Sequence, residues 1–571
     1  MQLPEQYAAA ESFELYLGDP AHPGSRISFA ASLELDEREE YPFEAHRCLD
    51  SWGLPEMYIP AQYGGRLESF EEVFALFRAL SRRDLTIALS HAITFLGALP
   101  IWIAGSDDQK AMVAELIRGR RKIAFAISER AHGADLLANE FEARQDADRY
   151  FIAGEKWLIG NATRATALTL FARTRPEGGP RGFALIFADE RLLDPATFHH
   201  LPKVPTVGLR GSDVSGICFN DCAVPLSARI GSSGSGFELA LKTLQITRTL
   251  VTGMSLGAAD TALRLAVDFA LTRRLYGGSV LDIPHARASL AGAFLDLMIC
   301  DCVAIGAARA LQVCPEQASI WSAVTKYFVP ATLDSAMRDV SVVLGARFFL
   351  RSGHPWSMFQ KMMRDSSIVG VFEGAGVVQL HTLALQLEHV TTARISEDLL
   401  RRRLKTIFSL REPLPAFDPR QLDLMSRDGC DPVCGIPLLC EQLRSLGVSD
   451  AVLKSGETVS RRYAEFVSDI GRAQGLSERP AVMPELARRC TLLHAAACSI
   501  AFWLHNREIL GDFFGREEWL SDCLNRIFAD RAAIAGNAAV ERELVERHRH
   551  QRLFSVVPVQ LALRGESAVD E

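Results

Sequence analysis

A block of short, β-prone segments lies between two longer blocks that are typical of helices. From residue 123 to about 230 the chain is rich in β-branched and aromatic residues, in segments that Gly, Pro, Asp and Asn separate. Residues 1 to 122 and 231 to 404 instead have helical patterns, with long Ala/Leu-rich stretches in the second of these blocks. Because strands and helices do not alternate, a doubly wound sheet is excluded. The order predicts an α+β protein.

A fourth block follows a proline-rich linker, LREPLPAFDPRQ, and we expect residues 405 to 571 to form a helical extension. Its apolar run at residues 490 to 504 is too short to span a bilayer, which takes roughly 17–25 residues. His494 also interrupts this run. We interpret it as a buried helix of a bundle rather than a membrane contact, and we expect no transmembrane segment.

Charge and cysteine content exclude several classes of protein. The net charge of −8 argues against a nucleic-acid partner, which would need a basic surface. The twelve cysteines form neither a disulfide framework nor the doubled CxxC pattern of a zinc site. The N-terminus has no basic region and no apolar core of a secretory signal. We therefore expect a cytoplasmic protein with reduced thiols and no bound metal.

One carboxylate stands out in the third block. In the segment MRDSSIVGVFEGAG, Glu373 directly follows an apolar run and precedes small residues. Poor solvation disfavours the charged form, so the sequence predicts a raised pKa for Glu373. Such a carboxylate suits a general base that removes a weakly acidic C–H proton near neutral pH. The alternative is a Glu that caps or pairs at the start of a helix near Val377.

Five ordered segments resemble signatures of the acyl-CoA dehydrogenase family. They are SERAHGAD at 128–135, GEKWLIGN at 154–161, GLRGSDVSGICFNDCAVP at 208–225, TRRLYG at 272–277 and MRD followed by FEG at 363–374. The resemblance covers residues from about 40 to 390. It implies an N-terminal helical domain, a middle β-barrel-like domain and a C-terminal four-helix bundle. In length and position, residues 405–571 resemble the extra helical domain of very-long-chain members, which are dimers.

The resemblance implies FAD-dependent α,β-dehydrogenation of an acyl thioester, with Glu373 as base and hydride transfer to flavin N5. Some members take the base from an earlier helix, directly before an Arg, but here that pair is Thr247-Arg248 and threonine cannot serve. In the family a flavin ribose hydroxyl and the backbone N–H of the catalytic Glu hold the thioester carbonyl. The implied substrate contacts are Gln245, Thr247, Arg248, Ala134 and Gly374. The carrier, coenzyme A or an acyl carrier protein, and the acceptor, an electron-transfer flavoprotein or oxygen, stay open.

Arg248 is also informative from spacing alone. It recurs with Phe237, Leu241, Leu244 and Val251 at intervals of four and three residues, which places it on the apolar face of a helix. A buried Arg needs a partner. A structural ion pair and a role near the thioester or the base are both open.

The positions implied to contact the flavin depart from the family pattern. Leu158 replaces the aromatic residue that packs on the flavin, and Gly160 replaces a Ser or Thr. The implied contacts are Ile127, Ser128, Gly133, Leu158, Ile159, Gly160, Arg273, Tyr276, Val342, Gly345 and Ala375. Each missing polar contact costs about 0.5–1.5 kcal/mol of binding. Two alternatives therefore stay open, a flavin monooxygenase on the same fold and a non-catalytic, FAD-poor binding or assembly homologue.

Arg273 and Tyr276 match the family pattern. In the family these two positions reach the flavin of an adjoining subunit. The resemblance therefore implies a homodimer.

Overall fold

The computed structural model describes residues 4–392, 394–473, 479–528 and 537–565. The chain divides into two compact units. Unit one contains residues 1–33, 69–85 and 248–571, and unit two contains residues 34–68 and 86–247. The predicted α+β class, with helical and β domains, is confirmed. The residue limits predicted for the four domains stay a prediction.

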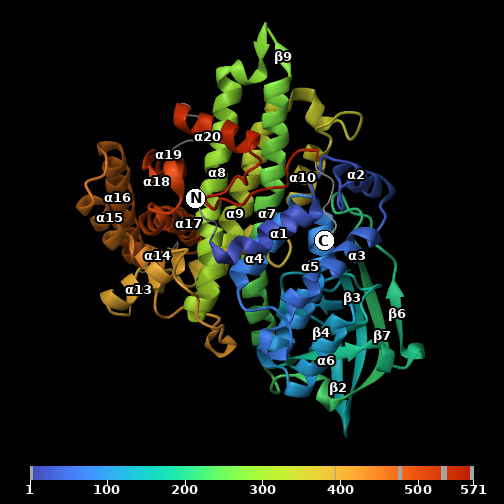
Figure 1. The fold of residues 1–571 in the computed structure, drawn as a ribbon. Helices are drawn as coiled ribbons and strands as arrows, with labels where there is room; N and C mark the ends of the chain where they lie inside the picture. Colours follow the sequence, from blue (N-terminus) through green and yellow to red (C-terminus); the bar gives the residue numbers. More distant parts are fainter. Residues whose placement is uncertain (1–3, 393, 474–478, 529–536, 566–571) are drawn as a thin grey trace. The chain divides into compact units, whose positions relative to one another are not determined.

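Unit two is built on an eight-stranded mixed sheet with the order β6-β7-β3-β2-β4-β5-β8, in which β1 pairs with β4 (Figure 1). The strands are β1 (Ile123–Ala126), β2 (Glu142–Asp146), β3 (Arg149–Gly160), β4 (Ala167–Arg173), β5 (Phe183–Asp189), β6 (Phe198–Leu201), β7 (Val214–Pro225) and β8 (Arg229–Ile230). The β1–β4 and β2–β4 pairs are parallel, and the others are antiparallel. Buried side chains such as Leu168, Leu170, Ile186 and Ile217 form the core of the sheet.

Helices α3 (Phe43–Trp52), α5 (Leu85–Ala104) and α6 (Asp107–Arg118) accompany this sheet. Helix α5 approaches it closely, because a Cβ at Gly97 would lie 2.7 Å from the carbonyl oxygen of Ile123 in β1. The hydroxyl of Thr169 in β4 donates to the Gly97 carbonyl at 2.8 Å. A glycine is therefore required where α5 crosses the sheet.

Unit one is helical. Its main helices are α1 (Ala8–Leu17), α4 (Phe70–Ser81), most of α7 (Gly236–Thr272), α8 (Pro284–Val313), α9 (Ala318–Leu344), α10 (Met358–Ser366), α11 (Gly376–Ala384) and α12 (Leu387–Val390), while α2 (Phe29–Arg38) crosses the boundary between the units. Helices α8 and α9 pack along each other, and α7 runs beside them (Figure 1). Gly257 lets α4 approach α7, because a Cβ there would lie 2.3 Å from the carbonyl oxygen of Arg78.

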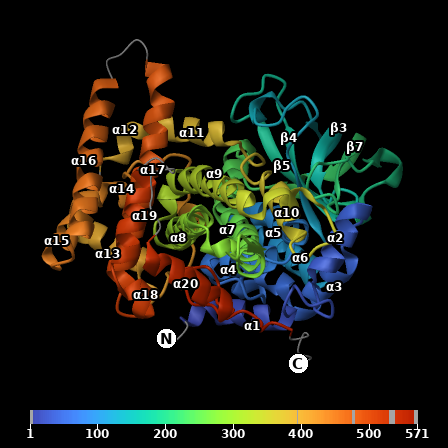
Figure 2. The same cartoon turned by 90° about the horizontal axis from the view of Figure 1, so that it is seen from above.

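The predicted helical extension is present and packs on α8 and α9 (Figure 2). It consists of α13 (Glu397–Phe408), α14 (Asp431–Cys434), α15 (Ile436–Ser445), α16 (Asp450–Ala473), α17 (Arg479–Asn506), α18 (Gly511–Gly515), α19 (Glu518–Phe528) and α20 (Ala538–Arg549). The apolar run at 490–504 lies in α17, and most of its side chains are buried against the bundle. The interpretation of this run as a buried bundle helix is confirmed.

Among the residues that the structure describes, three other helices are long and apolar enough to cross a membrane, judged by length and composition. They are α5, α7 and α8, and the most apolar windows of these helices are 67%, 100% and 100% buried within the protein. A helix that is apolar on all sides is expected wherever protein surrounds it. Burial in the fold thus accounts for their composition.

The cysteines are free thiols, and most of them are buried. Within the described residues, no group of three or more His, Cys, Asp or Glu side chains could hold a metal ion.

Candidate active site

Glu373 lies in the turn between α10 and α11, and its side chain is half-buried. Its backbone is left-handed, with φ of +56°, and Gly374 follows with φ of +103°. A left-handed conformation is uncommon for a residue with a Cβ and persists only where the surroundings enforce it. The turn around Glu373 must therefore be held by contacts from outside it.

Three consecutive carbonyl oxygens of this turn accept hydrogen bonds from side chains of α9, α7 and α11. The bonds run from Lys326 Nζ to Phe372 O at 2.7 Å, from Arg248 Nε to Glu373 O at 2.5 Å and from Gln379 Nε2 to Gly374 O at 3.0 Å. Because each peptide plane is fixed through its oxygen, the backbone of the turn has little freedom to rotate. The alternative that Glu373 caps α11 is not what the structure describes, since α11 begins at Gly376 with Ala375 as its N-cap.

Lys326 is only 1% exposed, and none of the family signatures includes it. Its ammonium group also bonds the carbonyl oxygen of Val369 and lies 4.3 Å from the centre of the Phe372 ring. Burial lowers the pKa of Lys326 to about 7, Glu373 opposes this shift and Arg248 adds to it. A single Lys among the apolar residues of α9 was the available sequence signal.

Arg248 is on the inward face of α7, as its spacing predicted, and its partner is the backbone of the turn. Burial lowers the pKa of this guanidinium, and the nearby Glu373 opposes the shift. A Cβ at Gly374 would lie 3.0 Å from Arg248 Nη2 and 2.6 Å from Gln379 Nε2. A side chain at this position would displace these two donors, and the φ of +103° at Gly374 also disfavours any residue with a Cβ. Gln245 and Thr247, which precede Arg248 on α7, are also buried.

In unit two the loop after β1 meets the end of β3. The Ser128 hydroxyl donates to the Trp157 carbonyl at 2.9 Å, and the Trp157 N–H donates to the Ser128 carbonyl at 3.0 Å. Leu158 sits at a register shift of β3, with φ of +58° and 45% of its surface exposed. The predicted cofactor residues Ser128 and Leu158 are thus brought together.

The remaining predicted positions of this loop differ in exposure. Gly133 and Ala134 are exposed, Ile127 is half-buried, and the Ile159 side chain is buried in the sheet core. At Gly160 a Cβ would lie 2.4 Å from Ile93 Cδ1, so Ile93 fills the space that a family Ser or Thr would need. The loss of that hydroxyl is built into the packing of α5.

Part of the surface that a flavin ring would need is provided by Ser128, Leu158 and Gly160. An exposed apolar side chain on a bulged strand offers a packing face for an aromatic ring system. Arg130 stacks over Trp157 at 4.6 Å and pairs with Glu155 at 2.9 Å. Leu158, with the backbone of Ser128 and Gly160 beside it, would hold the ring.

Other predicted cofactor positions lie on the surface of unit one. Arg273 and Tyr276 are at the hairpin of β9 (Arg274–Leu275) and β10 (Gly278–Ser279), beyond the end of α7 (Figure 1), and Tyr276 is 97% exposed. Val342 is exposed near the end of α9, and Gly345 follows it with φ of +57°. Ala375 is half-buried and directly follows Glu373 and Gly374.

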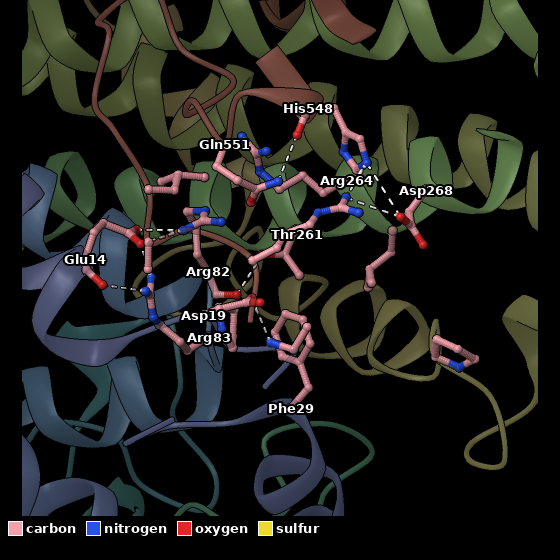
Figure 3. A pocket seen from close by; sticks show the side chains of 17 residues that line it. Glu14, Asp19, Phe29, Arg82, Arg83, Thr261, Arg264, Asp268, His548 and Gln551 are labelled. Carbon is pink, nitrogen blue, oxygen red and sulfur yellow. Dashed lines mark hydrogen bonds and ion pairs between the residues drawn. The ribbon is translucent and has the colours of Figure 1, made fainter. Parts of the chain in front are cut away.

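A cavity of about 220 Å³ lies elsewhere in unit one, between α1, α4, α7 and the C-terminal tail (Figure 3). Its arginines are already paired: Arg82 and Arg83 bond Glu14, and Arg82 and Arg264 bond Asp260. Neither Glu373 nor the three side chains that donate to the backbone of its turn line this cavity. The cavity is therefore separate from the candidate site.

Three family models match the chain in order. They describe the acyl-CoA dehydrogenase N-terminal domain at residues 28–120, the middle domain at 124–222 and the C-terminal domain at 234–387, together more than half of the chain. The probable acyl-CoA dehydrogenase FadE25 of Mycobacterium tuberculosis is 26% identical over 383 residues, which cover 65% of this chain and 97% of that relative.

Solved structures share the fold. An acyl-CoA dehydrogenase from Bacillus anthracis, complexed with FAD, matches with a TM-score of 0.70 and 18% identity, covering 95% of this chain and 91% of that one. The prolyl acyl carrier protein oxidase AnaB matches with a TM-score of 0.61 and 17% identity, covering 67% and 99%. The chain belongs to the acyl-CoA dehydrogenase family, whose members are FAD-dependent oxidoreductases acting on CH–CH bonds.

Proposed function

We propose that this chain converts an acyl thioester into the 2-enoyl thioester, with Glu373 as the base that removes the α proton. The observation that carries the proposal is the pinned turn, which presents a half-buried carboxylate from a left-handed backbone held by three side chains. Constraint of this kind is expected where a reacting group must be held in one geometry.

The chemistry balances as one proton and one hydride. The thioester acidifies the α C–H, the carboxylate of Glu373 takes the α proton, and a C=C bond forms between Cα and Cβ. FAD, when bound, accepts the β-hydrogen as hydride. The backbone N–H of Glu373 stabilises the negative charge that develops on the thioester oxygen. Glu373 thus contributes both a base and a hydrogen-bond donor.

The partners follow from the same proposal. The acyl carrier is coenzyme A. The alternative carrier is an acyl carrier protein, which the likeness to the prolyl acyl carrier protein oxidase AnaB makes worth testing. The external electron acceptor would be an electron-transfer flavoprotein or oxygen. The exposed Arg273 and Tyr276 support a homodimer in which the hairpin reaches a second chain. We place this activity in the cytoplasm.

Incubation of the purified, FAD-loaded protein with butyryl-, octanoyl- and palmitoyl-coenzyme A tests the reaction class. The expected product is two mass units lighter than the substrate, and an external acceptor sustains turnover. Oxygen consumption that depends on added reduced flavin, without the enoyl product, would indicate a monooxygenase. Protein that stays colourless and takes up no FAD in titration would indicate a non-catalytic homologue.

A further inference from the structure

We infer that Lys326 is a positioning residue for the reaction: by holding the carbonyl oxygen of Phe372, it sets the direction of the Glu373 N–H. This inference rests on the proposed function. It assigns a task to a side chain of α9 that lies 47 positions before Glu373 and that no sequence motif identified.

The argument starts from the peptide plane. The carbonyl of Phe372 and the N–H of Glu373 belong to one planar, trans peptide unit, so they point in opposite directions. Lys326 Nζ holds this oxygen at 2.7 Å from the side of α9. The N–H of Glu373 is therefore directed away from α9. Any rotation of this plane breaks the bond to Lys326.

Lys326 also contacts the segment that precedes this plane. Its Nζ also bonds the carbonyl oxygen of Val369, three residues earlier, so one amine joins two carbonyls of the segment that leads to Glu373. The Phe372 ring lies 4.3 Å from the same Nζ. The Phe372 N–H is held as well, by the Ile368 carbonyl at 3.1 Å. These contacts hold the residues before the plane, and the bond from Lys326 to the Phe372 oxygen holds the plane itself.

The other two donors act on the following planes. Arg248 holds the Glu373 oxygen and Gln379 holds the Gly374 oxygen, so they orient the N–H groups of the next two residues. Lys326 is the donor whose loss releases the plane that carries the Glu373 N–H. Its removal should affect the stabilisation of charge on the thioester oxygen more than the binding of the substrate.

The test is Lys326→Met, which keeps an unbranched apolar side chain, one atom shorter than lysine, but has no donor. The matched control is Thr325→Val, one position earlier on α9, where the buried hydroxyl donates to the Trp321 carbonyl of its own helix at 2.7 Å. The probe is octanoyl-coenzyme A deuterated at the α carbon, incubated in water without an electron acceptor. Loss of deuterium, followed by mass spectrometry, reports proton removal independently of steady-state turnover.

We expect Lys326→Met to lower the exchange rate and kcat about 10²-fold, with KM changed by less than about threefold and the FAD content unchanged. For Thr325→Val, the exchange rate, kcat, KM and FAD content should stay within about threefold of the wild-type values. If Lys326→Met does not fold, Lys326→Gln, which keeps two N–H donors on a shorter side chain, should fold and retain an intermediate exchange rate.

Deuterium exchange by Lys326→Met at more than a third of the wild-type rate would overturn this inference. If Lys326→Met does not fold and Lys326→Gln does, exchange by Lys326→Gln at the wild-type rate would overturn it. An equal loss in Thr325→Val would overturn it too, since any disturbance of α9 would then suffice. Failure of the proposed function would give a different result from failure of this inference. In that case Glu373→Gln would exchange deuterium as fast as the wild type.

Discussion

Arg248 Nε donates a hydrogen bond of 2.5 Å to the carbonyl oxygen of Glu373, 125 positions further along the chain. This bond joins α7 to the turn that presents the candidate base. The partner of this half-buried guanidinium is the backbone of the turn that carries Glu373, whereas a role of Arg248 in the reaction stays a prediction. Binding at a backbone atom leaves the carboxylate of Glu373 outside this hydrogen bond.

Replacement of Arg248 by Lys should lower kcat about tenfold and leave the protein folded. Lysine keeps the charge but lacks the planar group that reaches the Glu373 oxygen through Nε. Stopped-flow measurement of flavin reduction by a thioester checks the rate, and thermal unfolding checks the fold. An unchanged rate of flavin reduction would mean that the Arg248–Glu373 bond does not hold the turn in its reactive geometry.

Gly374→Ala should lower the free energy of unfolding by about 2–4 kcal/mol. The backbone there is left-handed at φ of +103°, and a Cβ would lie 2.6 Å from Gln379 Nε2. Gly353→Ala is the matched control, since Gly353 also has a left-handed backbone, at φ of +84°, but a Cβ there would have no described atom within 4 Å. We expect Gly353→Ala to lower the free energy of unfolding by about 1 kcal/mol, measured by urea unfolding. Equal losses in both variants would remove the steric part of the explanation.

The stability of the protein should depend on pH through Lys326. Its pKa is about 7 in the folded state, against roughly 10.4 in an unfolded chain. Between these values the unfolded state binds the additional proton, so the free energy of unfolding rises with pH. Lys326 should contribute about 2 kcal/mol to this rise between pH 7 and 9.

The measurement is urea unfolding of the wild type and Lys326→Met at pH 7, 8 and 9. Taking the difference between the free energies of unfolding of the two proteins cancels the contributions of other titrating groups, such as the buried thiols. A difference that stays constant over this range would show that Lys326 keeps an ordinary pKa in the folded protein.

Gly160→Ser should restore the hydroxyl that the family has at this position, but at a cost in stability of about 1–3 kcal/mol. A Cβ at Gly160 would lie 2.4 Å from Ile93 Cδ1. The double variant Gly160→Ser with Ile93→Ala should be more stable than the sum of the single effects, because the two positions share one space. A double-mutant cycle by thermal unfolding, with FAD affinity measured by titration, checks this. Strict additivity would contradict the packing argument.

The sequence predicted the order of domains because β-branched residues, turns and apolar periodicity are local properties. The β-prone pattern of this block does not extend to β2, because this strand, EARQD, is mostly exposed and polar. The resemblance to the family pointed to Glu373, Arg248 and Gly374, and the structure brings these three residues together. The signatures could not locate Lys326 as a donor to the turn, because its contact depends on how α9 packs against a segment 46 positions away. Gln379 lies only five positions after Gly374, but its contact depends on how the turn folds back on α11.

The flavin positions show the same limit. The change to Gly160 was visible in the sequence as a lost hydroxyl. Its physical reason, Ile93 of α5 filling the space, depends on tertiary packing between residues 67 positions apart. Likewise, α7 and α8 read as apolar on all sides because other parts of the protein surround them, which the sequence alone does not show.

The most direct test of the central claim is the rate at which an acyl thioester bleaches the flavin of Glu373→Gln. The control is Glu388→Gln, the same substitution at an exposed position on α12. With FAD bound equally in all proteins, we predict that bleaching by octanoyl-coenzyme A falls at least about 10³-fold in Glu373→Gln and is unchanged in Glu388→Gln. Bleaching of Glu373→Gln at the wild-type rate would contradict the assignment of Glu373 as the base.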